Sequence, residues 1–207
     1  MKLLSGRRIV LATLALTCAS GLFALPARAA DNAKQFIQSF GNQLVAVVNS
    51  PVPLAEKKTK VLPLVQKNVD IDGIGRYCLG RYWKIATAEQ KQHYLTLFHQ
   101  VLVNAITDKL GEYRGVSFTI GDVSKVGSED SVSATLVRPQ QPPAAMQWIV
   151  SYDSGKPQVV DVIGEGASLR LTQRNDYSSF IARNGGNVDT LLSALQKQLD
   201  RHAQPAD

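Results

Sequence analysis

Cysteine and histidine are scarce in this sequence, which has two cysteines and three histidines among 207 residues. Cys18 lies in an apolar segment near the N-terminus, so removal of that segment would leave Cys78 alone and exclude an internal disulfide. His93 and His99 are six positions apart, which does not fit the i, i+4 spacing of helical metal ligands, and His202 lies in a polar tail. We therefore predict no metal, no cofactor and a fold held together by packing.

Catalytic motifs are also missing. The sequence has no G-x-S-x-G, H-E-x-x-H, C-x-x-C or Gly-Lys-Ser/Thr motif, and no histidine occupies an obvious partner position for Cys78. These absences predict a protein that is not an enzyme. Asp161 is the one acid among apolar neighbours, and a carboxylate in a pocket can act as a base. Because both faces of its strand are apolar, its orientation stays open, and it could equally support the following turn.

A strong excess of charge is absent once the N-terminal segment is set aside. Lys2, Arg7 and Arg8 precede an apolar run from Ile9 to Leu25, and Ala27-Arg28-Ala29 fits an A-x-A cleavage site. This pattern predicts a secretory signal peptide. The apolar run is short for a membrane-spanning helix. Leu16 and Thr17 before Cys18 make a poor lipoprotein box, so we do not expect a lipid anchor.

Removal of the signal peptide changes what the charge implies. The chain has 23 basic and 17 acidic residues, and four basic and no acidic residues lie in the first 30, so the net charge falls from +6 to +2. A nucleic-acid partner is therefore not expected. We predict a signal peptide over residues 1–30 and a single domain over residues 31–207.

The hydrophobic pattern changes once along the mature chain. Helical spacing predicts helices over 32–49, 54–69 and from Thr87 to about Tyr113, and Pro63 should kink or restart the second. After Gly115 the period becomes two in four segments joined by short polar loops, which predicts an antiparallel meander. The last strand, Val159 to Ile163, turns at Gly164-Glu165-Gly166 into another helix. The prediction is an α+β fold of helices packed on a four-stranded antiparallel sheet.

Two segments carry a recognisable family pattern. The first has Leu79-Gly80-x-x-Trp83-Lys84, and the second is Asp161-Val-Ile-Gly-Glu-Gly-Ala-Ser-Leu169, followed by Arg174 and Phe180. The chain resembles the MlaC/Ttg2D family over nearly its whole mature length. The resemblance implies a periplasmic lipid-binding protein of an ABC-type system that moves phospholipids between the two membranes of Gram-negative bacteria. It also implies a curved sheet, NTF2-like in outline, that encloses an apolar cavity for acyl chains.

The resemblance leaves alternatives open. One branch of the family is associated with hopanoid biosynthesis, so a rigid polycyclic lipid is a second candidate ligand. NTF2-like folds include enzymes with a pocket carboxylate, and an enzyme acting on an apolar substrate with Asp161 as base is the alternative function. Periodicity alone does not distinguish a cavity wall from a filled core.

Within this interpretation we expect a monomer that meets inner- and outer-membrane transport complexes transiently. We expect Arg170 and Arg174, which are four residues apart beyond the sheet, to meet a lipid headgroup. The predicted lipid-binding wall consists of Ile74, Leu79, Phe98, Leu102, Trp148, Val150, Ile163 and Leu169.

Overall fold

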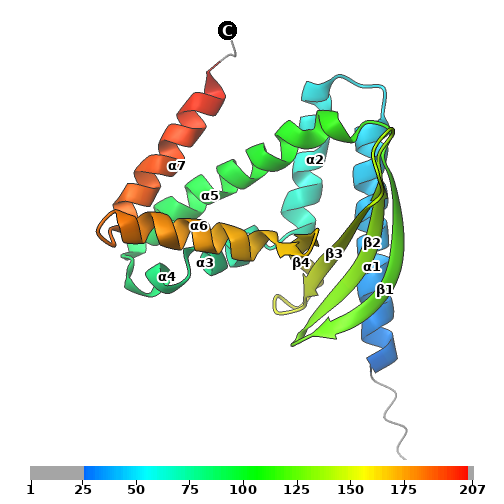
Figure 1. Ribbon diagram of the computed structural model, residues 1–207, viewed down its shortest axis with the longest axis horizontal. Helices are drawn as coiled ribbons and strands as arrows, with labels where there is room; N and C mark the ends of the chain where they lie inside the picture. Colours follow the sequence, from blue (N-terminus) through cyan, green and yellow to red (C-terminus); the bar gives the residue numbers. More distant parts are fainter. Residues whose placement is uncertain (1–25, 205–207) are drawn as a thin grey trace, which may run out of the picture.

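The computed structural model describes residues 26–204, and the side chains from residue 31 onward. The predicted signal peptide lies outside the described residues except for its last five, which form the start of the first helix. Seven helices, one 3₁₀ helix and five strands follow one another in this described part of the chain (Figure 1). In order they are α1 (Pro26–Asn49), α2 (Leu54–Asn68), α3 (Ile71–Leu79), α4 (Arg81–Ile85), α5 (Ala88–Asp108), η1 (Lys109–Tyr113), β1 (Ser117–Val126), β2 (Glu129–Val137), β3 (Ala144–Ser151), β4 (Gln158–Gly164), β5 (Ala167–Ser168), α6 (Leu169–Arg183) and α7 (Val188–Ala203).

The strands form one antiparallel sheet in the order β1-β2-β3-β4-β5, so the predicted α+β meander is confirmed. The predicted number of four strands was wrong by one short strand. Glu165 and Gly166 both have positive φ, 51° and 80°, and form the tight turn that pairs β5 with the end of β4. This turn sends the chain directly into α6.

Strand β4 contains one residue more than β3 where the two pair, a β-bulge at Val160. The bulge interrupts the simple alternation of the strand, so Val159 and Val162, rather than Val159 and Asp161, share a face. Ile163 consequently points to the opposite face. The pairs that define the register are Trp148 with Val162, Ile149 with Asp161, and Val150 with Val159.

Helix ends follow the capping signals in the sequence. The Asp70 side chain accepts a hydrogen bond from the Gly73 N–H at 2.9 Å at the start of α3, and Thr87 with Gln90 forms a complete capping box on α5. The helix does not restart at Pro63, because α2 continues through it. Pro63 is exposed, so water can hydrogen-bond the helix carbonyl that has lost its N–H partner.

The helices pack on the sheet in two groups. Helix α1 lies across one face of the sheet, where Ile37 and Phe40 contact buried residues of the strands. Helices α3, α5, α6 and α7 form a second group, with Tyr94 and Ile181 fully buried among them (Figure 1). The Tyr94 hydroxyl donates to the Gly75 carbonyl at 2.9 Å and so ties α5 to α3. The site described next lies where the two groups meet.

Candidate functional site

An apolar cavity of about 440 Å³ lies between the sheet, α1, α2, α5 and the start of α6. Its walls are aliphatic and aromatic side chains, and its few polar groups are concentrated on β4 and the first turns of α6. Side chains at i, i+3 and i+4 on α5 form one wall, because that stripe of the helix faces the sheet. The lining from α5 is Phe98, Val101, Leu102, Ala105 and Ile106.

A second apolar cavity of about 400 Å³ adjoins the first, toward β1 and η1. The two cavities are neighbouring lobes that share wall residues from α1, α5, β3, β4 and α6. The aromatic residue at the junction is Trp148, whose ring contacts Phe40 and Phe118 edge-on at 5.9 and 6.3 Å between centroids. The shared wall is Leu44, Leu102, Ala105, Ile106, Trp148, Val162 and Leu169.

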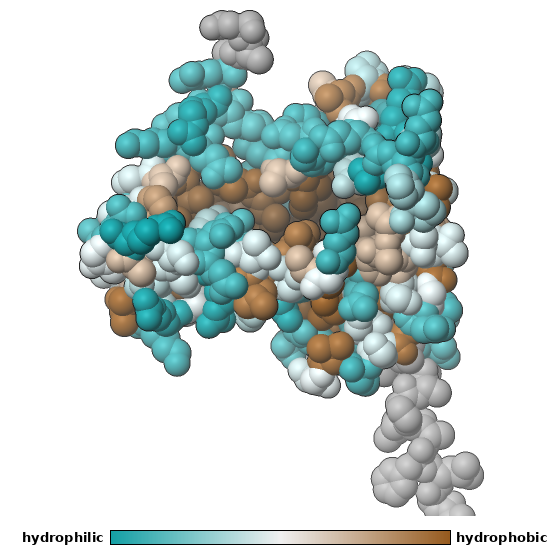
Figure 2. All heavy atoms as spheres, in the orientation of Figure 1, coloured by the Kyte–Doolittle hydropathy of each residue, from teal (hydrophilic) through white to brown (hydrophobic). Residues whose placement is uncertain are grey.

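The cavity opens to the surface along the gap between α5 and α6. Figure 2 shows apolar atoms at the bottom of a hollow between these helices, with hydrophilic side chains along its upper edge. Leu169 lines both lobes, yet its side chain is 60% exposed. A large apolar side chain at such a position marks a rim rather than a core.

The structure brings five of the eight residues predicted for a lipid-binding wall into the cavity. They come from four elements that are far apart in the sequence, α3, α5, β3 and α6, and that the fold brings together around the cavity. These five are Ile74, Phe98, Leu102, Trp148 and Leu169.

The other three predicted wall residues lie elsewhere. Leu79 is fully buried in the helical core among α3, α5, α6 and α7. Val150 is on the same sheet face as Trp148, but it is buried beneath α1 next to Ile37. Ile163 is on the opposite face because of the bulge in β4, and it lines a separate depression there.

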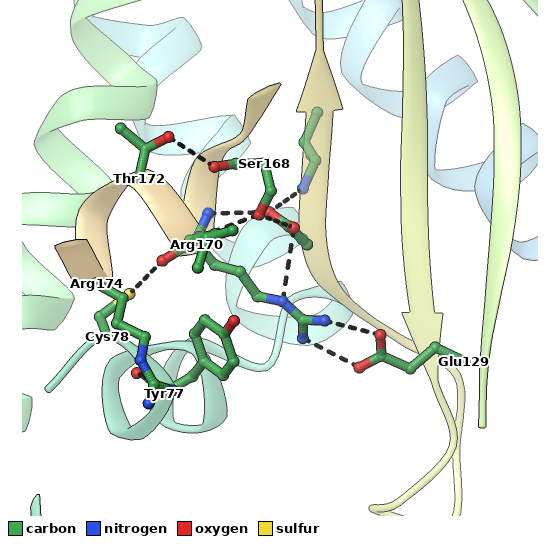
Figure 3. Close-up of polar contacts among 10 residues, drawn as sticks. Tyr77, Cys78, Glu129, Ser168, Arg170, Thr172 and Arg174 are labelled. Carbon is green, nitrogen blue, oxygen red and sulfur yellow. Dashed lines mark hydrogen bonds and ion pairs between the residues drawn. The ribbon is translucent and has the colours of Figure 1, made fainter. Parts of the chain in front are cut away.

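Arg170 lines the cavity but is paired with acidic side chains, and Arg174 is not among the lining residues. Arg170 forms two parallel hydrogen bonds to Glu129, at 3.0 and 2.8 Å, and its Nε lies 3.5 Å from Asp161 (Figure 3). Both guanidinium groups stack on the ring of Tyr77, each 4.8 Å from its centroid. We call these five residues the arginine clasp. It joins α3, β2, β4 and α6.

Asp161 is engaged on both of its carboxylate oxygens. Oδ1 accepts from the backbone N–H groups of Val162 and Arg170 at 2.8 and 3.0 Å, and Oδ2 accepts from the Ser168 hydroxyl at 2.5 Å. Ser168 in turn caps α6 by accepting from the Leu171 N–H at 3.0 Å. The carboxylate, although it reaches the cavity wall, therefore orients the turn and the helix start, which is the second of the two roles that the sequence left open.

Cys78 also lines the cavity, and its thiol contacts the Arg170 carbonyl at 3.5 Å. Burial raises the pKa of this thiol to about 12, with the Asp161 charge adding to the effect. A thiol in this state is protonated at neutral pH and is a poor nucleophile. Groups of three or more His, Cys, Asp or Glu side chains that could hold a metal do not occur among residues 26–204.

Sequence reasoning missed wall residues on the first two helices and at the bulge. Phe40 and Leu44 line the cavity from α1, and Val65 lines it from α2. Their spacing within each helix indicates an inward face, but it does not indicate which part of that face meets a void. Val162 joins the wall only because of the bulge, for which the sequence has no local signal.

Comparison with known proteins identifies relatives of the chain. Two curated relatives are the intermembrane phospholipid transport system binding protein MlaC of Haemophilus influenzae, 22% identical over 62% of each chain, and the toluene tolerance protein ttg2D of Pseudomonas putida, 25% identical over 67% of this chain and 66% of that protein. The chain thus spans just under two thirds of the length of each.

A solved structure shares the fold. The phospholipid-binding protein from Ralstonia solanacearum, determined in complex with a phospholipid, superposes with a TM-score of 0.73 and is 20% identical, covering 84% of this chain and 99% of that one. The model of the family described as "MlaC protein" matches residues 30–197, beginning where the predicted signal peptide ends. The chain belongs to the MlaC family.

Proposed function

We propose that this protein is a periplasmic lipid carrier that holds the hydrocarbon part of a phospholipid in its two-lobed apolar cavity. The observation that supports this most directly is the pair of adjoining apolar cavities under the sheet, with an apolar hollow open between α5 and α6. Family membership and the phospholipid bound in the R. solanacearum protein support the same ligand class. The cavity wall residues Phe98, Leu102 and Trp148 would contact the acyl chains.

The energetics suit a carrier that both takes up and releases its ligand. Each buried methylene is worth about 0.8 kcal/mol relative to water, so two chains of roughly 16 carbons gain about 25 kcal/mol. That exceeds any known non-covalent affinity. The donor, however, is a bilayer whose interior is as apolar as the cavity, so the net free energy of transfer is close to zero. A cavity with few polar contacts adds little specific binding energy, so the free energy of transfer stays close to zero.

The proposal includes a transport route. The carrier, a monomeric domain over residues 31–207, would receive lipid from one membrane complex of an ABC-type system and deliver it to another across the periplasm. Export agrees with the N-terminal pattern, and within residues 26–204 no helix is long and apolar enough to cross a bilayer. The engagement of Asp161 in the arginine clasp supports a carrier rather than an enzyme with that residue as base.

Extraction of the purified protein tests the proposal. Protein made with its signal peptide in a Gram-negative host is extracted with organic solvent, and the lipids are quantified by mass spectrometry. We expect close to one phospholipid per protein. A stoichiometric polycyclic lipid would keep the carrier and change the ligand to the hopanoid class. Protein that holds no lipid as purified, and takes up none from phospholipid vesicles, would refute the proposal.

A further inference from the structure

A groove between α6 and α7 lies next to the apolar cavity. Gln173 and Tyr177 line both spaces, so the groove and the cavity adjoin along α6. Figure 2 shows the apolar hollow extending along α6 toward the end of the molecule where α7 begins. We call this the α6–α7 groove. Its remaining lining is Asp176, Ser179, Phe180, Arg183, Leu191, Ala194, Leu195, Gln198 and Arg201.

Three charged side chains line the α6–α7 groove. Asp176, Arg183 and Arg201 are exposed, and among the residues that the structure describes none of the three side chains forms an ion pair or hydrogen bond. Arg170 differs from them, because its guanidinium is paired with Glu129, and Arg174 lies over the Tyr77 ring and does not line the groove. The groove therefore presents three charges that no side chain among the described residues neutralises.

The groove brings charged side chains of the two helices to one depression. A short turn over residues 184–187 joins α6 to α7, and the two helices diverge from it, so the groove widens away from the turn (Figure 1). Arg201 is in the last turn of α7, and Asp176 is at the middle of α6, next to Tyr177. Arg183 ends α6, at the opposite end of the groove. Arg201 and Asp176 thus line different walls of a groove that also includes Gln173 and Tyr177 of the cavity wall.

We propose that the α6–α7 groove binds the headgroup of a zwitterionic phospholipid, with Arg201 contacting the phosphate and Asp176 contacting the ammonium group. The inference rests on the proposed carrier function. A headgroup cannot enter the apolar cavity without losing its hydration, so it must remain at the opening while the chains are inside. Guanidinium groups suit phosphate oxygens, and a carboxylate suits a primary ammonium. A net-anionic headgroup without an ammonium group would contact Arg201 through its phosphate but would gain no contact with Asp176.

The test measures which lipids the protein takes up. Delipidated protein is incubated with vesicles of equal parts phosphatidylethanolamine and phosphatidylglycerol, reisolated, and its lipids are quantified. The wild type should load phosphatidylethanolamine about two- to threefold over phosphatidylglycerol, the range expected for one exposed ionic contact. Asp176→Asn should bring that ratio to the vesicle ratio. Arg201→Gln should lower the loading of both lipids about two- to threefold.

Arg76→Gln is the matched control. Arg76 is an exposed cation in the last turn of α3, so this variant loses the same charge from the same kind of helix position but away from the groove. Its loading and lipid ratio should equal those of the wild type. At 0.5 M salt, screening should reduce the differences caused by Asp176→Asn and Arg201→Gln.

The outcomes separate this inference from the proposed function. A wild-type protein that loads no lipid at all refutes the carrier. A wild-type protein that loads lipid in the vesicle ratio, or loading by Arg201→Gln equal to the wild type, overturns the headgroup site and leaves the carrier standing. An Arg76→Gln protein that loses as much lipid as Arg201→Gln also overturns it, because the effect would then belong to overall charge.

Discussion

Asp161 accounts for much of the local order at the opening of the cavity. Its carboxylate is 5% exposed and binds two backbone N–H groups, a hydroxyl and a guanidinium, so it joins β4, the turn and α6. The sequence showed an acid among apolar residues, which is compatible with a base or with a structural group. The contacts that decide between them come from Ser168 and Arg170, seven and nine residues further along.

Replacement of Asp161 by asparagine should therefore cost stability. The amide removes the charge that pairs with Arg170, which is itself mostly buried, and its NH₂ group cannot accept the Ser168 hydrogen bond. We expect the free energy of unfolding to fall by about 2–4 kcal/mol, measured by urea denaturation. Asp153→Asn, in the exposed turn between β3 and β4, is the control and should change it little. An Asp161→Asn protein as stable as the wild type would contradict the structural role.

At the scale of elements, the sequence predicted well wherever the signal was local. The helix start predicted at Thr87 is the one that the structure shows, with Thr87 as the N-cap of α5. The alternation after Gly115 located the strands. The bulge at Val160 was not predictable, because it depends on how β4 pairs with β3 and not on the sequence of β4 alone. Ile163 was expected in the cavity wall, and that single extra residue is the reason why it lies on the opposite face of the sheet.

The C-terminal helix is tied to the rest of the fold by a small charged group. Asp108, at the end of α5, contacts Lys58 of α2 at 2.9 Å and His202 of α7 at 2.8 Å. The hydrogen bond from Lys58, followed by that from His202, holds the pKa of the Asp108 carboxyl below its usual value. A lowered pKa in the folded protein means that stability from this group is present above the unfolded pKa, near 4, and is lost as the pH falls through the folded pKa.

Asp108→Asn should then destabilise the protein at pH 7 but not at strongly acidic pH. The side chain is 42% exposed, so solvent screening limits the effect to about 0.5 kcal/mol or less. The measurement is the urea midpoint of the variant and the wild type at pH 7 and near pH 3, and the difference should shrink at the lower pH. Glu56→Gln, which removes an exposed pair within α2, controls for general charge loss. A difference that grows on acidification would refute the assignment.

At the scale of the whole molecule, the sequence indicated inward-facing residues but not which of them face a void. Leu102 and Val150 were expected in the same wall. Leu102 is half-buried and lines both lobes, whereas Val150 is fully buried under α1. The difference arises from how far α1 extends over the sheet, which depends on packing between distant segments. The two positions therefore separate a cavity from a filled core.

Tryptophan substitutions at these positions should have opposite effects. Leu102→Trp should place its ring in the void, leave the urea midpoint nearly unchanged and lower the lipid-to-protein ratio at least twofold. Val150→Trp should overpack the core and lower the free energy of unfolding by about 1–3 kcal/mol. Both variants are purified in parallel and assayed for bound lipid and urea stability. Full lipid occupancy in a folded Leu102→Trp protein would remove Leu102 from the binding wall.

The arginine clasp lies beside the void and links the walls on either side of it. Its guanidinium, carboxylate and phenol groups bridge α3, α6 and two strands without using the space between them. Because these contacts do not involve a ligand, they can hold the cavity walls in place whether the cavity is filled or empty. The cavity walls therefore need not collapse when the cavity is empty, which is what the proposed carrier would require between one lipid and the next.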